Sequence, residues 1–440
     1  MNRKEAEDYI YKSYLKAEKY QDYNDSDSNK RRPDLSKAII EKLSINPCVV
    51  VTGSKGKGSV SCMISQILQS KLKVGLLTSP HLVNFCERFK IDGHDISDSD
   101  FIKNVEAVQP VFDKIDKDIP LNTCISPIGI QVAVALNYFN EKQTDFNVFE
   151  CGKGAKYDDV NNVIHQYSIV NSIFLEHTRE LGDTLEKIAE DKAHVINRGQ
   201  KCVYIAKQET GVLNVLLGKA LSMGVSAKVY GKDFMAQNIQ YTNKGMRFDI
   251  TIGNETYKDI TIPLLGEHQA RNCALALAFC KDILEDFDME IIKKNLMSIN
   301  WPGRMEIISS SPFIMLDACI NRKSCINIKQ VISFLNLSKP TIIIGIPDDK
   351  DYIGVAEEMS KDEANIVLTK SQNPHYIFTE KQASVLKEKG IKSIWIPDIH
   401  SAIEYAKNLN QPIIILGTTS VVSEVKILQQ SRTLDNTDIC

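Results

Sequence analysis

The stretch PCVVVTGSKGKGS, residues 47–59, decides how the rest of the chain is organised. Cys48–Thr52 is a short apolar run rich in β-branched residues, which is typical of a buried strand. Three glycines and two lysines follow within residues 53–58, and residues 60–69, VSCMISQILQ, place apolar side chains at helical spacing. A strand, a glycine-rich loop and a helix in this order form a cradle for phosphate, since backbone N–H groups turn toward the anion and the helix N-terminus adds positive potential.

The same loop carries the side chains that phosphate chemistry requires. Lys57 is placed to reach the β- and γ-phosphates of a nucleotide, and the Ser59 hydroxyl is placed to bind Mg²⁺. The spacing differs from the general P-loop pattern GxxxxGK[ST], because Gly58 is inserted between the lysine and the serine. The alternative is a glycine-rich turn with surface lysines, but the flanking strand and helix favour the phosphate site.

Composition indicates an ordinary globular protein. The 440 residues suggest two or three domains of about 150 residues each. A net charge of −3 argues against a large nucleic-acid-binding surface, and no apolar run reaches the ~18 residues of a membrane span. The eleven cysteines are an odd number without a CxxC pair, which favours free thiols in a reducing compartment. The first twenty residues are charged throughout and unlike a signal peptide, so we expect a cytoplasmic protein that binds neither nucleic acid nor membranes.

Two further apolar segments deliver candidate metal ligands. Residues 145–150, DFNVFE, predict a strand with Glu150 at its carboxyl end, and residues 169–178, IVNSIFLEHT, predict another that ends near His177. Ligand groups collect at strand ends beside the phosphate loop of an open parallel sheet, so both residues are candidates for binding Mg²⁺. The alternatives are a surface acid and a structural histidine.

The remaining pattern alternates between helices and strands. A helix predicted over residues 184–198 carries Lys192, which taken alone is an ordinary helix lysine. MRFDITI and TYKDITI alternate around Gly253-Asn254 and predict a β-hairpin, and residues 266–284 predict a helix with a buried face. The helical pattern breaks at residues 300–303, where we place a domain boundary. Strands are then predicted over residues 313–317, 341–345, 366–368, 393–396 and 412–417.

This alternation implies mainly parallel sheets covered by helices. We therefore predict an α/β protein with two domains. Residues 1–300 form a P-loop ATPase domain with a parallel-rich sheet, and residues 301–440 form a smaller α/β domain.

Short motifs occur in a specific order along the chain. They are GSKGKGS at 53–59, TSPHL at 78–82 with CER at 86–88, ECGKGAKYDDVN at 150–161, LEHTRELGDTLEKIAEDKA at 175–193, GEHQARN at 266–272, WPGRME at 301–306 and DKD at 349–351. Their number and order resemble the folylpolyglutamate synthase/dihydrofolate synthase family of the Mur-ligase superfamily, from about residue 49 to 425. The resemblance implies an N-terminal P-loop ATPase domain and a C-terminal Rossmann-like domain, with the active site in the cleft between them.

The resemblance also implies amide bond formation, in which ATP phosphorylates a carboxylate and the amine of an amino acid displaces phosphate. In that scheme the predicted catalytic residues are Lys57, Lys192 and His177, and Lys57 stabilises the γ-phosphate. Mg²⁺ is held by Ser59, Glu150 and His177. Lys192 aligns with a lysine that family members carbamylate, and the carbamate supports a second metal or the phosphate site. The predicted ATP contacts are Gly53, Ser54, Lys55, Gly56, Lys57, Gly58, Ser59, Asn272, Arg304 and Asp317, with His268 and Gln269 in the same motif as Asn272.

The sequence departs from the family at positions where family members bind the pterin substrate and the glutamate. The family motif DGAHNP is DACINR here, so Ile320 stands where the family has a histidine that faces the incoming amino acid. Isoleucine cannot hydrogen-bond a carboxylate. Lys153 is added and Lys156 replaces an arginine in the segment that follows Glu150, and the late TGS motif is Leu416-Gly417-Thr418. The predicted substrate contacts are Ser79, His81, Arg88, Lys153, Lys156, Asp158, Ile320 and Thr418.

Three functions remain open at this point. The first is an ATP-dependent ligase that adds glutamate to a folate or to dihydropteroate. The second is a ligase of the same superfamily that joins a different amino acid to a non-folate carboxylate, which the departures favour. The third is a nucleotide-binding protein that has lost ligase activity and acts through a partner. A plain P-loop NTPase or kinase is a further option, but it would leave the later motifs unexplained. We expect a monomer whose partners are small molecules, with ATP and Mg²⁺ as cofactors.

Overall fold

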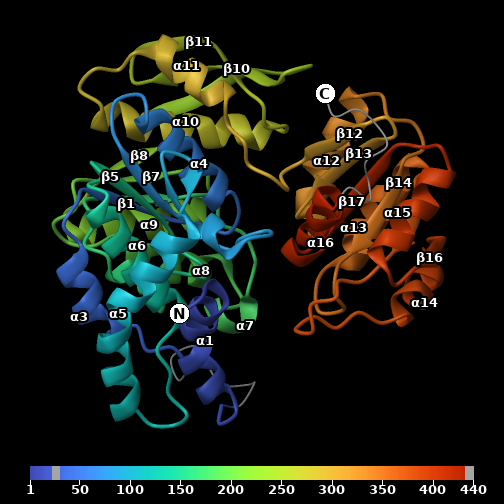
Figure 1. Ribbon diagram of the computed structural model, residues 1–440. Helices are drawn as coiled ribbons and strands as arrows, with labels where there is room; N and C mark the ends of the chain where they lie inside the picture. The colour runs from blue at the N-terminus through green and yellow to red at the C-terminus, as the bar shows by residue number, and fades with distance from the viewer. Residues whose placement is uncertain (22–29, 432–440) are drawn as a thin grey trace.

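The computed structural model describes residues 1–21 and 30–431 and confirms the predicted α/β class. Two mainly parallel sheets lie side by side, each between layers of helices (Figure 1). Residues 22–29 and 432–440 of the two predicted domains lie outside the described part. Residues 298–305 connect the two halves without helix or strand, and we propose the domain boundary there.

The N-terminal sheet has eight strands in the order β4-β3-β2-β5-β1-β6-β7-β8. Pairing is parallel from β2 to β8, whereas β3 and β4 add an antiparallel edge. Because β1 lies between β5 and β6, the ends of these three strands bring their loops to one edge of the sheet. The strands are β1 (Cys48–Thr52), β2 (Val74–Leu77), β3 (Phe89–Ile91), β4 (His94–Asp95), β5 (Phe146–Glu150), β6 (Tyr167–Val170), β7 (Cys202–Ile205) and β8 (Ser226–Val229).

Both faces of this sheet are buried. In β1 the side chains of Cys48 and Val50 enter one core, and those of Val49 and Val51 enter the other, as the two-residue period of a strand requires. One face is covered by α1 (Arg3–Glu18), α3 (Asp34–Leu43), α5 (Asp98–Asp118), α6 (Pro127–Glu141), α8 (Leu185–Lys192) and α9 (Thr210–Met223). The other is covered by α4 (Lys57–Leu68), α10 (Glu267–Ile283) and α11 (Met289–Met297).

A small antiparallel sheet packs on α10, at the top of Figure 1. It consists of β9 (Phe234–Thr242), β10 (Gly245–Ile252) and β11 (Glu255–Ile262). The predicted hairpin β10–β11 is confirmed. The sequence analysis did not identify β9 or α9.

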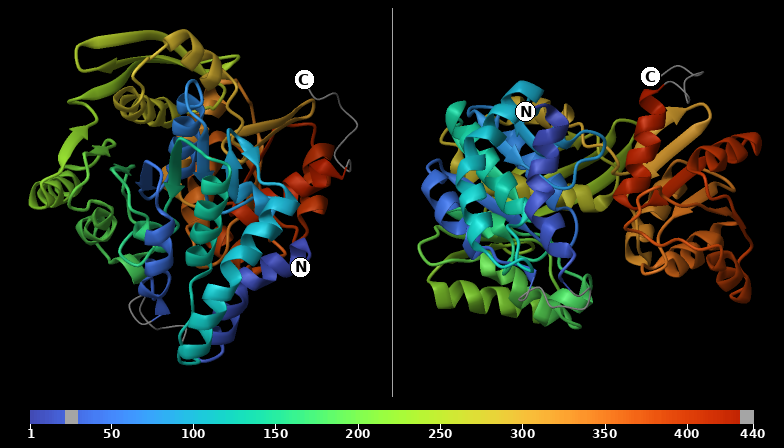
Figure 2. Two further views of the ribbon diagram at one scale, coloured as in Figure 1. Left: turned by 60° about the vertical axis from the view of Figure 1, so that its left-hand side comes forward. Right: turned by 60° about the horizontal axis from the view of Figure 1, so that its bottom comes forward.

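The C-terminal sheet has six strands in the order β12-β13-β17-β14-β15-β16, and only β12 is antiparallel to its neighbour. The five predicted strands are confirmed, and β12 is an addition. The strands are β12 (Glu306–Ser310), β13 (Phe313–Asp317), β14 (Thr341–Gly345), β15 (Asn365–Leu368), β16 (Ser393–Trp395) and β17 (Ile413–Gly417). One face carries α12 (Arg322–Phe334), α13 (Tyr352–Met359) and α14 (Lys381–Glu388), and the other carries α15 (Ile399–Asn408) and α16 (Thr419–Gln430) (Figure 2).

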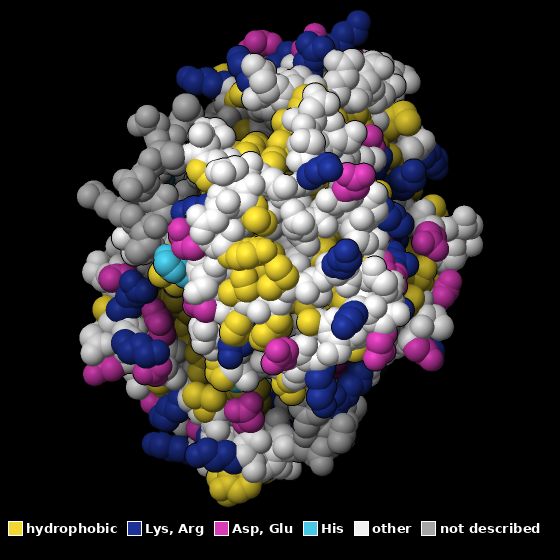
Figure 3. Space-filling view, turned by 90° about the vertical axis from the view of Figure 1, so that its right-hand side faces the viewer, with side chains coloured by type: hydrophobic (Ala, Val, Ile, Leu, Met, Phe, Trp, Pro, Cys, Tyr) yellow, Lys and Arg dark blue, Asp and Glu magenta, His cyan; other side chains and the backbone are white. Residues whose placement is uncertain are grey.

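The face in Figure 3 belongs to the side of the molecule where this C-terminal sheet lies. Charged side chains of both signs are scattered over it around a central group of hydrophobic side chains. The helices within residues 1–21 and 30–431 are each too short or too polar to span a bilayer.

Two expectations about the stretch after β6 were wrong. The strand predicted over residues 169–178 ends at Val170. The chain then turns because Asn171 binds the backbone of the following residue and Ser172 O accepts a hydrogen bond from Ser54 N (2.9 Å). The helix predicted over residues 184–198 is shorter, since α8 ends at Lys192 and a 3₁₀ turn, η3 (Ala193–Val195), follows.

Candidate active site

The phosphate loop, residues 53–59, is held in place by Asn171, the residue that follows β6. Gly56 is the N-cap of α4 and has a φ of 75°, a left-handed conformation that glycine adopts without strain. A Cβ at Gly56 would lie 2.6 Å from Nδ2 of Asn171, so the position also lacks room. The same Nδ2 donates to Lys55 O at 3.0 Å. The predicted strand, loop and helix are therefore present, with the first turn of α4 opening onto the loop.

Two lysines converge on one carbonyl of this loop. Lys57 Nζ and Lys192 Nζ both donate to Gly53 O, at 3.0 and 2.9 Å. Lys192 is fully buried and forms a 2.9 Å ion pair with Glu176. Burial, followed by the nearby charge of Lys57, lowers the pKa of Lys192. Two cations and one carboxylate leave net positive charge under the loop, where an anion is favoured.

Glu150 lies at the end of β5 on the other side of the loop. It is buried, and its Oε2 accepts a hydrogen bond from Ser79 N at 3.2 Å. A Cβ at Gly58 would lie 3.3 Å from this oxygen and 2.8 Å from the Trp301 ring, so only glycine lets the carboxylate approach the loop this closely. Burial raises the pKa of Glu150 to about 7, although Lys57 opposes the shift.

These residues fit a Mg²⁺ site in part. The Ser59 hydroxyl is buried in the first turn of α4, and Glu150 is a buried carboxylate that forms no ion pair within the described residues. Mg²⁺ prefers oxygen ligands and is commonly held by one or two protein groups together with substrate phosphates, which matches this pair.

His177 is placed differently from the expectation. It does not end a strand, but lies in an exposed loop with a φ of 46°, directly before α7 (Thr178–Leu181). Partial desolvation by the surrounding loop lowers the pKa of the ring, and the charges of Glu176 and Lys153 act on it in opposite directions. No group of three or more His, Cys, Asp or Glu side chains that could hold a metal ion occurs in the described residues. The roles of His177 and Lys192 at a metal therefore stay predictions.

Side chains in the first turns of α10 form hydrogen bonds beside the phosphate loop. Asn272 Oδ1 accepts from Asn171 Nδ2 at 3.1 Å, and Asn272 Nδ2 donates to Gln269 Oε1 at 3.0 Å. Gln269 Nε2 lies 3.5 Å from Ser59 Oγ. His268 Nδ1 is buried and has no hydrogen-bond partner among the described residues, and burial lowers the pKa of this ring to about 4.

The predicted ATP contacts of the C-terminal half face the loop across the cleft. Asp317, at the end of β13, accepts from Met305 N at 2.9 Å, and Arg304 Nη1 donates to Gly303 O at 3.0 Å. Burial raises the pKa of Asp317, while the charges of Lys55 and Arg304 oppose the shift. Asp317 of the C-terminal half therefore lies within the electrostatic influence of Lys55, a residue of the phosphate loop.

Among the predicted substrate contacts, His81 and Arg88 are hydrogen-bonded to each other, and Ser79 lies two residues before His81. Arg88 Nε donates to His81 Nδ1 at 2.9 Å, and Arg88 Nη1 donates to Gln131 Oε1 at 2.8 Å. Because arginine can only donate, the neutral His81 ring carries its proton on Nε2. Burial and the charge of Arg88 lower the pKa of His81 to about 4, so the ring is neutral near pH 7.

A cavity of about 540 Å³ adjoins this group. Its walls come from α4, the β3–β4 edge, the residue 298–304 connection and the start of α16. Residues from both halves of the chain meet in it, and they include Gly58, Ser79, His81, Glu150, Arg304 and Thr419.

The other predicted substrate residues do not line this cavity. Asp158 is buried and accepts from the backbone N–H of Gly152 (2.8 Å) and Val160 (3.0 Å), so it shapes its own loop. Lys153 forms a 3.4 Å ion pair with Glu180, and Lys156 lies over the Tyr157 ring.

Ile320 and Thr418 are used inside the C-terminal half. Ile320 packs against the hydrophobic core on the α12 side of the sheet. The Thr418 hydroxyl accepts from Val421 N and caps α16. Neither side chain is brought together with Ser79 and His81.

The sequence analysis missed two residues that organise the site. Asn171 ties the phosphate loop to α10, and Glu176 pairs with Lys192. A polar residue directly after a buried strand was the available signal for Asn171, as it was for Glu150. The pairing of Glu176 had no signal, because the turn after Val170 that places it is a tertiary feature.

Comparisons with known proteins identify the family of the chain. Residues 51–280 match the family model "Mur ligase middle domain". The chain is similar to folylpolyglutamate synthase from Lacticaseibacillus casei, with 27% identity over 86% of this chain and 88% of that one. The structure resembles that of Mycobacterium tuberculosis folylpolyglutamate synthase complexed with ADP, with a TM-score of 0.84, 25% identity, and 98% and 100% of the two chains covered.

A second solved structure is described as a complex of folylpolyglutamate synthase with AMPPCP and folate. It shares 25% identity and a TM-score of 0.80, over 99% of this chain and 100% of that one. The chain belongs to the folylpolyglutamate synthase/dihydrofolate synthase family of the Mur-ligase superfamily.

Proposed function

We propose that this chain, an ATP-dependent ligase by family, joins glutamate to the carboxylate of a folate or of dihydropteroate. The carboxylate oxygen attacks the γ-phosphorus of ATP, and ADP leaves. The amine of the amino acid then attacks the carbonyl carbon of the acyl phosphate, loses a proton, and displaces inorganic phosphate. The observation that carries this proposal is the convergence of Lys57 and Lys192 on the phosphate loop, with Glu150 on its other side.

Each group has a physical task in this reaction. Charge develops on the phosphoryl oxygens, so positioned cations supply most of the catalysis. When ATP binds, the Lys57 ammonium leaves its hydrogen bond with Gly53 O and contacts the γ-phosphate. The N–H groups of the loop hold the remaining phosphates. Ser59 and Glu150 would hold Mg²⁺, which supplies a further positive charge to the phosphates when bound.

We also propose that Lys192 is carbamylated in the working enzyme. The neutral amine of Lys192 adds CO₂ and loses one proton. A buried side chain that can carry a positive charge then carries a negative one. The lowered pKa of Lys192 favours the neutral amine that this step requires. Activity should fall when CO₂ is removed and return with bicarbonate, and a Lys192→Ala variant should be rescued by a short carboxylic acid. Activity that is indifferent to CO₂, with no rescue, would contradict carbamylation.

The glutamate and folate assignment draws on the names of the similar proteins, and the folate complex among the similar structures supports it. A second candidate is a different amino acid joined to a non-folate carboxylate. Ile320 favours it, since this partly buried side chain packs against the core and offers no hydrogen bond. We further propose a cytoplasmic monomer, consistent with the ten described cysteines, which are all free and buried.

Phosphate release and product mass together test the assignment. ATP and Mg²⁺ are combined with glutamate and either dihydropteroate or tetrahydrofolate, and then with a panel of other amino acids and carboxylates. Release that requires both glutamate and a pteridine substrate, with a product heavier by one glutamyl residue, is the expected result. Release only with another pair would establish the second candidate, and ATP binding without release under every condition would contradict ligase activity.

A further inference from the structure

Lys55 reaches from the phosphate loop into the C-terminal half of the molecule. Its Nζ donates a hydrogen bond to Ser324 Oγ, in the first turn of α12. Lys55 stands at a position where the family loop GTNGKGS has asparagine, a shorter and uncharged side chain. The contact therefore joins the two halves of the chain through a residue that departs from the family motif.

Ser324 is oriented to accept this bond. Its hydroxyl donates to Asn321 Oδ1 at 2.9 Å, and its backbone N–H donates to the same oxygen at 3.0 Å. Because the hydroxyl has only one proton, its lone pairs remain for the ammonium, which can only donate. The order Lys55 to Ser324 to Asn321 is thus fixed in direction, and a charged donor makes its first bond stronger than a neutral one.

Two further contacts come from the same end of α12. Lys323 Nζ lies 5.3 Å from the centre of the Phe174 ring, and Asn327 lies close enough to His268 to oppose the lowering of the pKa of that ring. Phe174 and His268 both belong to the N-terminal half, on the turn after β6 and on α10. Lys323, Ser324 and Asn327, which we call the α12 docking face, lie within two turns of one helix.

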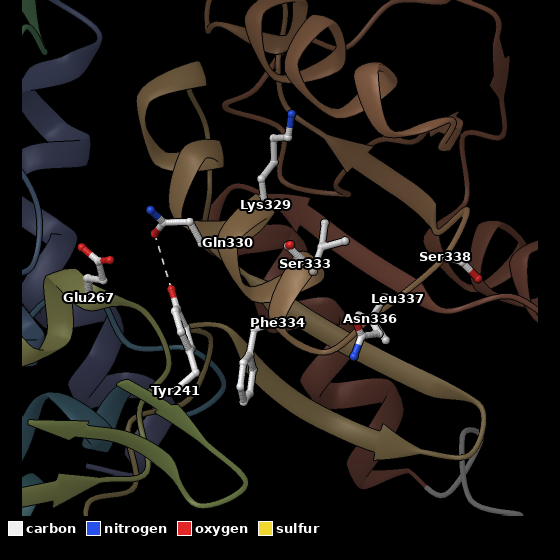
Figure 4. Close-up of a pocket in the computed structure, with 10 residues that line it drawn as sticks. Tyr241, Glu267, Lys329, Gln330, Ser333, Phe334, Asn336, Leu337 and Ser338 are labelled. Atoms are coloured by element: carbon white, nitrogen blue, oxygen red, sulfur yellow. Dashed lines mark hydrogen bonds between the residues drawn. The ribbon is translucent and has the colours of Figure 1, made fainter. Parts of the chain in front are cut away.

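The far end of α12 touches the small sheet. Figure 4 shows Tyr241 of β9 turned toward Gln330 and Phe334 of α12. The Tyr241 and Phe334 rings stack at 5.0 Å, and Tyr241 Oη donates to Gln330 Oε1 at 3.4 Å. The helix therefore contacts the N-terminal half near both of its ends, and the contact from the phosphate loop is the one that Lys55 makes.

We propose that Lys55 is a positioning residue, which holds the α12 docking face on the phosphate loop through Ser324 and so sets the C-terminal half in place for nucleotide binding. The segment before α12 carries Asp317, a predicted ATP contact, so a shift of α12 would move that carboxylate away from the loop. This inference rests on the proposed function only for its kinetic consequence.

Distance measurements between the two halves test the proposal without any assay of activity. One spin label is attached at Leu221 on α9 and the other at Glu388 on α14. Both residues are exposed, and neither belongs to the site described above. Lys55→Asn and Ser324→Ala should each broaden the distance distribution relative to the parent chain. Lys55→Arg, which keeps a charged donor, should give the distribution of the parent chain. Ser333→Ala, an exposed serine of the same helix, is the matched control and should match the parent chain.

The kinetic readout separates positioning from a general loss of structure. Each of the two variants should raise KM for ATP about tenfold with a smaller change in kcat. The double variant should do no worse than the more affected single one, because both remove the same bond. Unfolding temperatures verify that the variants are folded.

Unchanged distances in both folded variants, or additive effects in the double variant, would overturn the proposal. A parent chain that releases no phosphate would instead refute the proposed function, and the distance measurements would still decide the role of Lys55.

Discussion

The two sides of the active site are built on different principles. On the N-terminal side, Lys57, Lys192, Glu150 and Ser59 surround a loop whose backbone is fixed by Asn171. On the C-terminal side, the positions that the family uses to read the amino acid serve the fold itself, as core packing for Ile320 and a helix cap for Thr418. We therefore propose that the phosphoryl chemistry rests on these N-terminal residues, and that groups other than Ile320 and Thr418 recognise the acceptor.

The largest effect should follow the loss of Lys57. Lys57→Ala removes the cation that faces the γ-phosphate, so kcat for phosphate release should fall about 10³-fold. Lys42→Ala, at an exposed lysine of α3, is the matched control and should be unchanged. A Lys57→Ala variant that retains most of its rate would break the assignment of phosphoryl chemistry to the loop.

A smaller but large effect is expected at Lys192. Lys192→Met removes the buried partner of Glu176, and we expect kcat to fall about 10²-fold because a group near the phosphates is lost. Lys187→Met, on the exposed face of the same helix, should behave like the parent chain in the same steady-state assay. Equal rates for the two variants would show that Lys192 serves structure alone.

Glu150 predicts a dependence of stability on pH. The pKa of Glu150 is raised from 4.5 to about 7 in the folded chain. Between pH 4.5 and 7 the folded state therefore binds more protons than the unfolded state. The contribution of Glu150 lowers the free energy of unfolding as the pH rises through this range. Glu150→Gln should then stabilise the metal-free chain at pH 8 by up to roughly 3 kcal/mol. It should also raise the Mg²⁺ concentration that phosphate release requires, because one of the two proposed protein ligands loses its charge.

Chemical denaturation at pH 5 and pH 8 provides the measurement for Glu150. The gain from Glu150→Gln should be small at pH 5, and Mg²⁺ with ADP should stabilise the parent chain more than the variant at pH 8. A variant that is less stable than the parent at pH 8 would mean that the carboxylate is already compensated without a metal.

The smallest effect should come from the C-terminal side. Ile320→Ala should cost about 1–3 kcal/mol of unfolding free energy because a core contact is lost, while KM for the amino acid changes less than about threefold. Ile326→Ala, at an exposed isoleucine of α12, should leave both quantities unchanged. A large rise in KM for Ile320→Ala would place the amino acid against this side chain and remove the contrast between the two sides.

Local sequence patterns predicted the regular elements well, because their signals are local. β1, β13 and β14 have the predicted bounds, since each is a continuous apolar run that ends where its sheet meets a loop. The course of the chain after β6 was not predicted. The apolar run IVNSIF continues past the end of the strand, and contacts of this stretch with Asn171 and Ser54 accompany its turn away from the sheet.

The same distinction holds for the site. The loop motif predicted Lys57 and Ser59, which lie in the first turn of α4, and the end of an apolar run predicted Glu150, whose carboxylate lies beside Gly58 of the loop. The pair of Lys192 with Glu176 and the bond from Lys55 to Ser324 join residues from different elements, so their side chains meet only after folding. The acid–base state of His81 likewise depends on Arg88, whose Nε donates to the ring.

Isotope transfer tests the central claim, activation of a carboxylate as an acyl phosphate, most directly. The acceptor is supplied with ¹⁸O in its carboxylate, and the inorganic phosphate released with ATP, Mg²⁺ and the amino acid is analysed by mass. The account predicts one ¹⁸O atom in each phosphate, because the bridging oxygen of the acyl phosphate leaves with phosphorus. Phosphate that contains no ¹⁸O, formed together with the amide product, would contradict it.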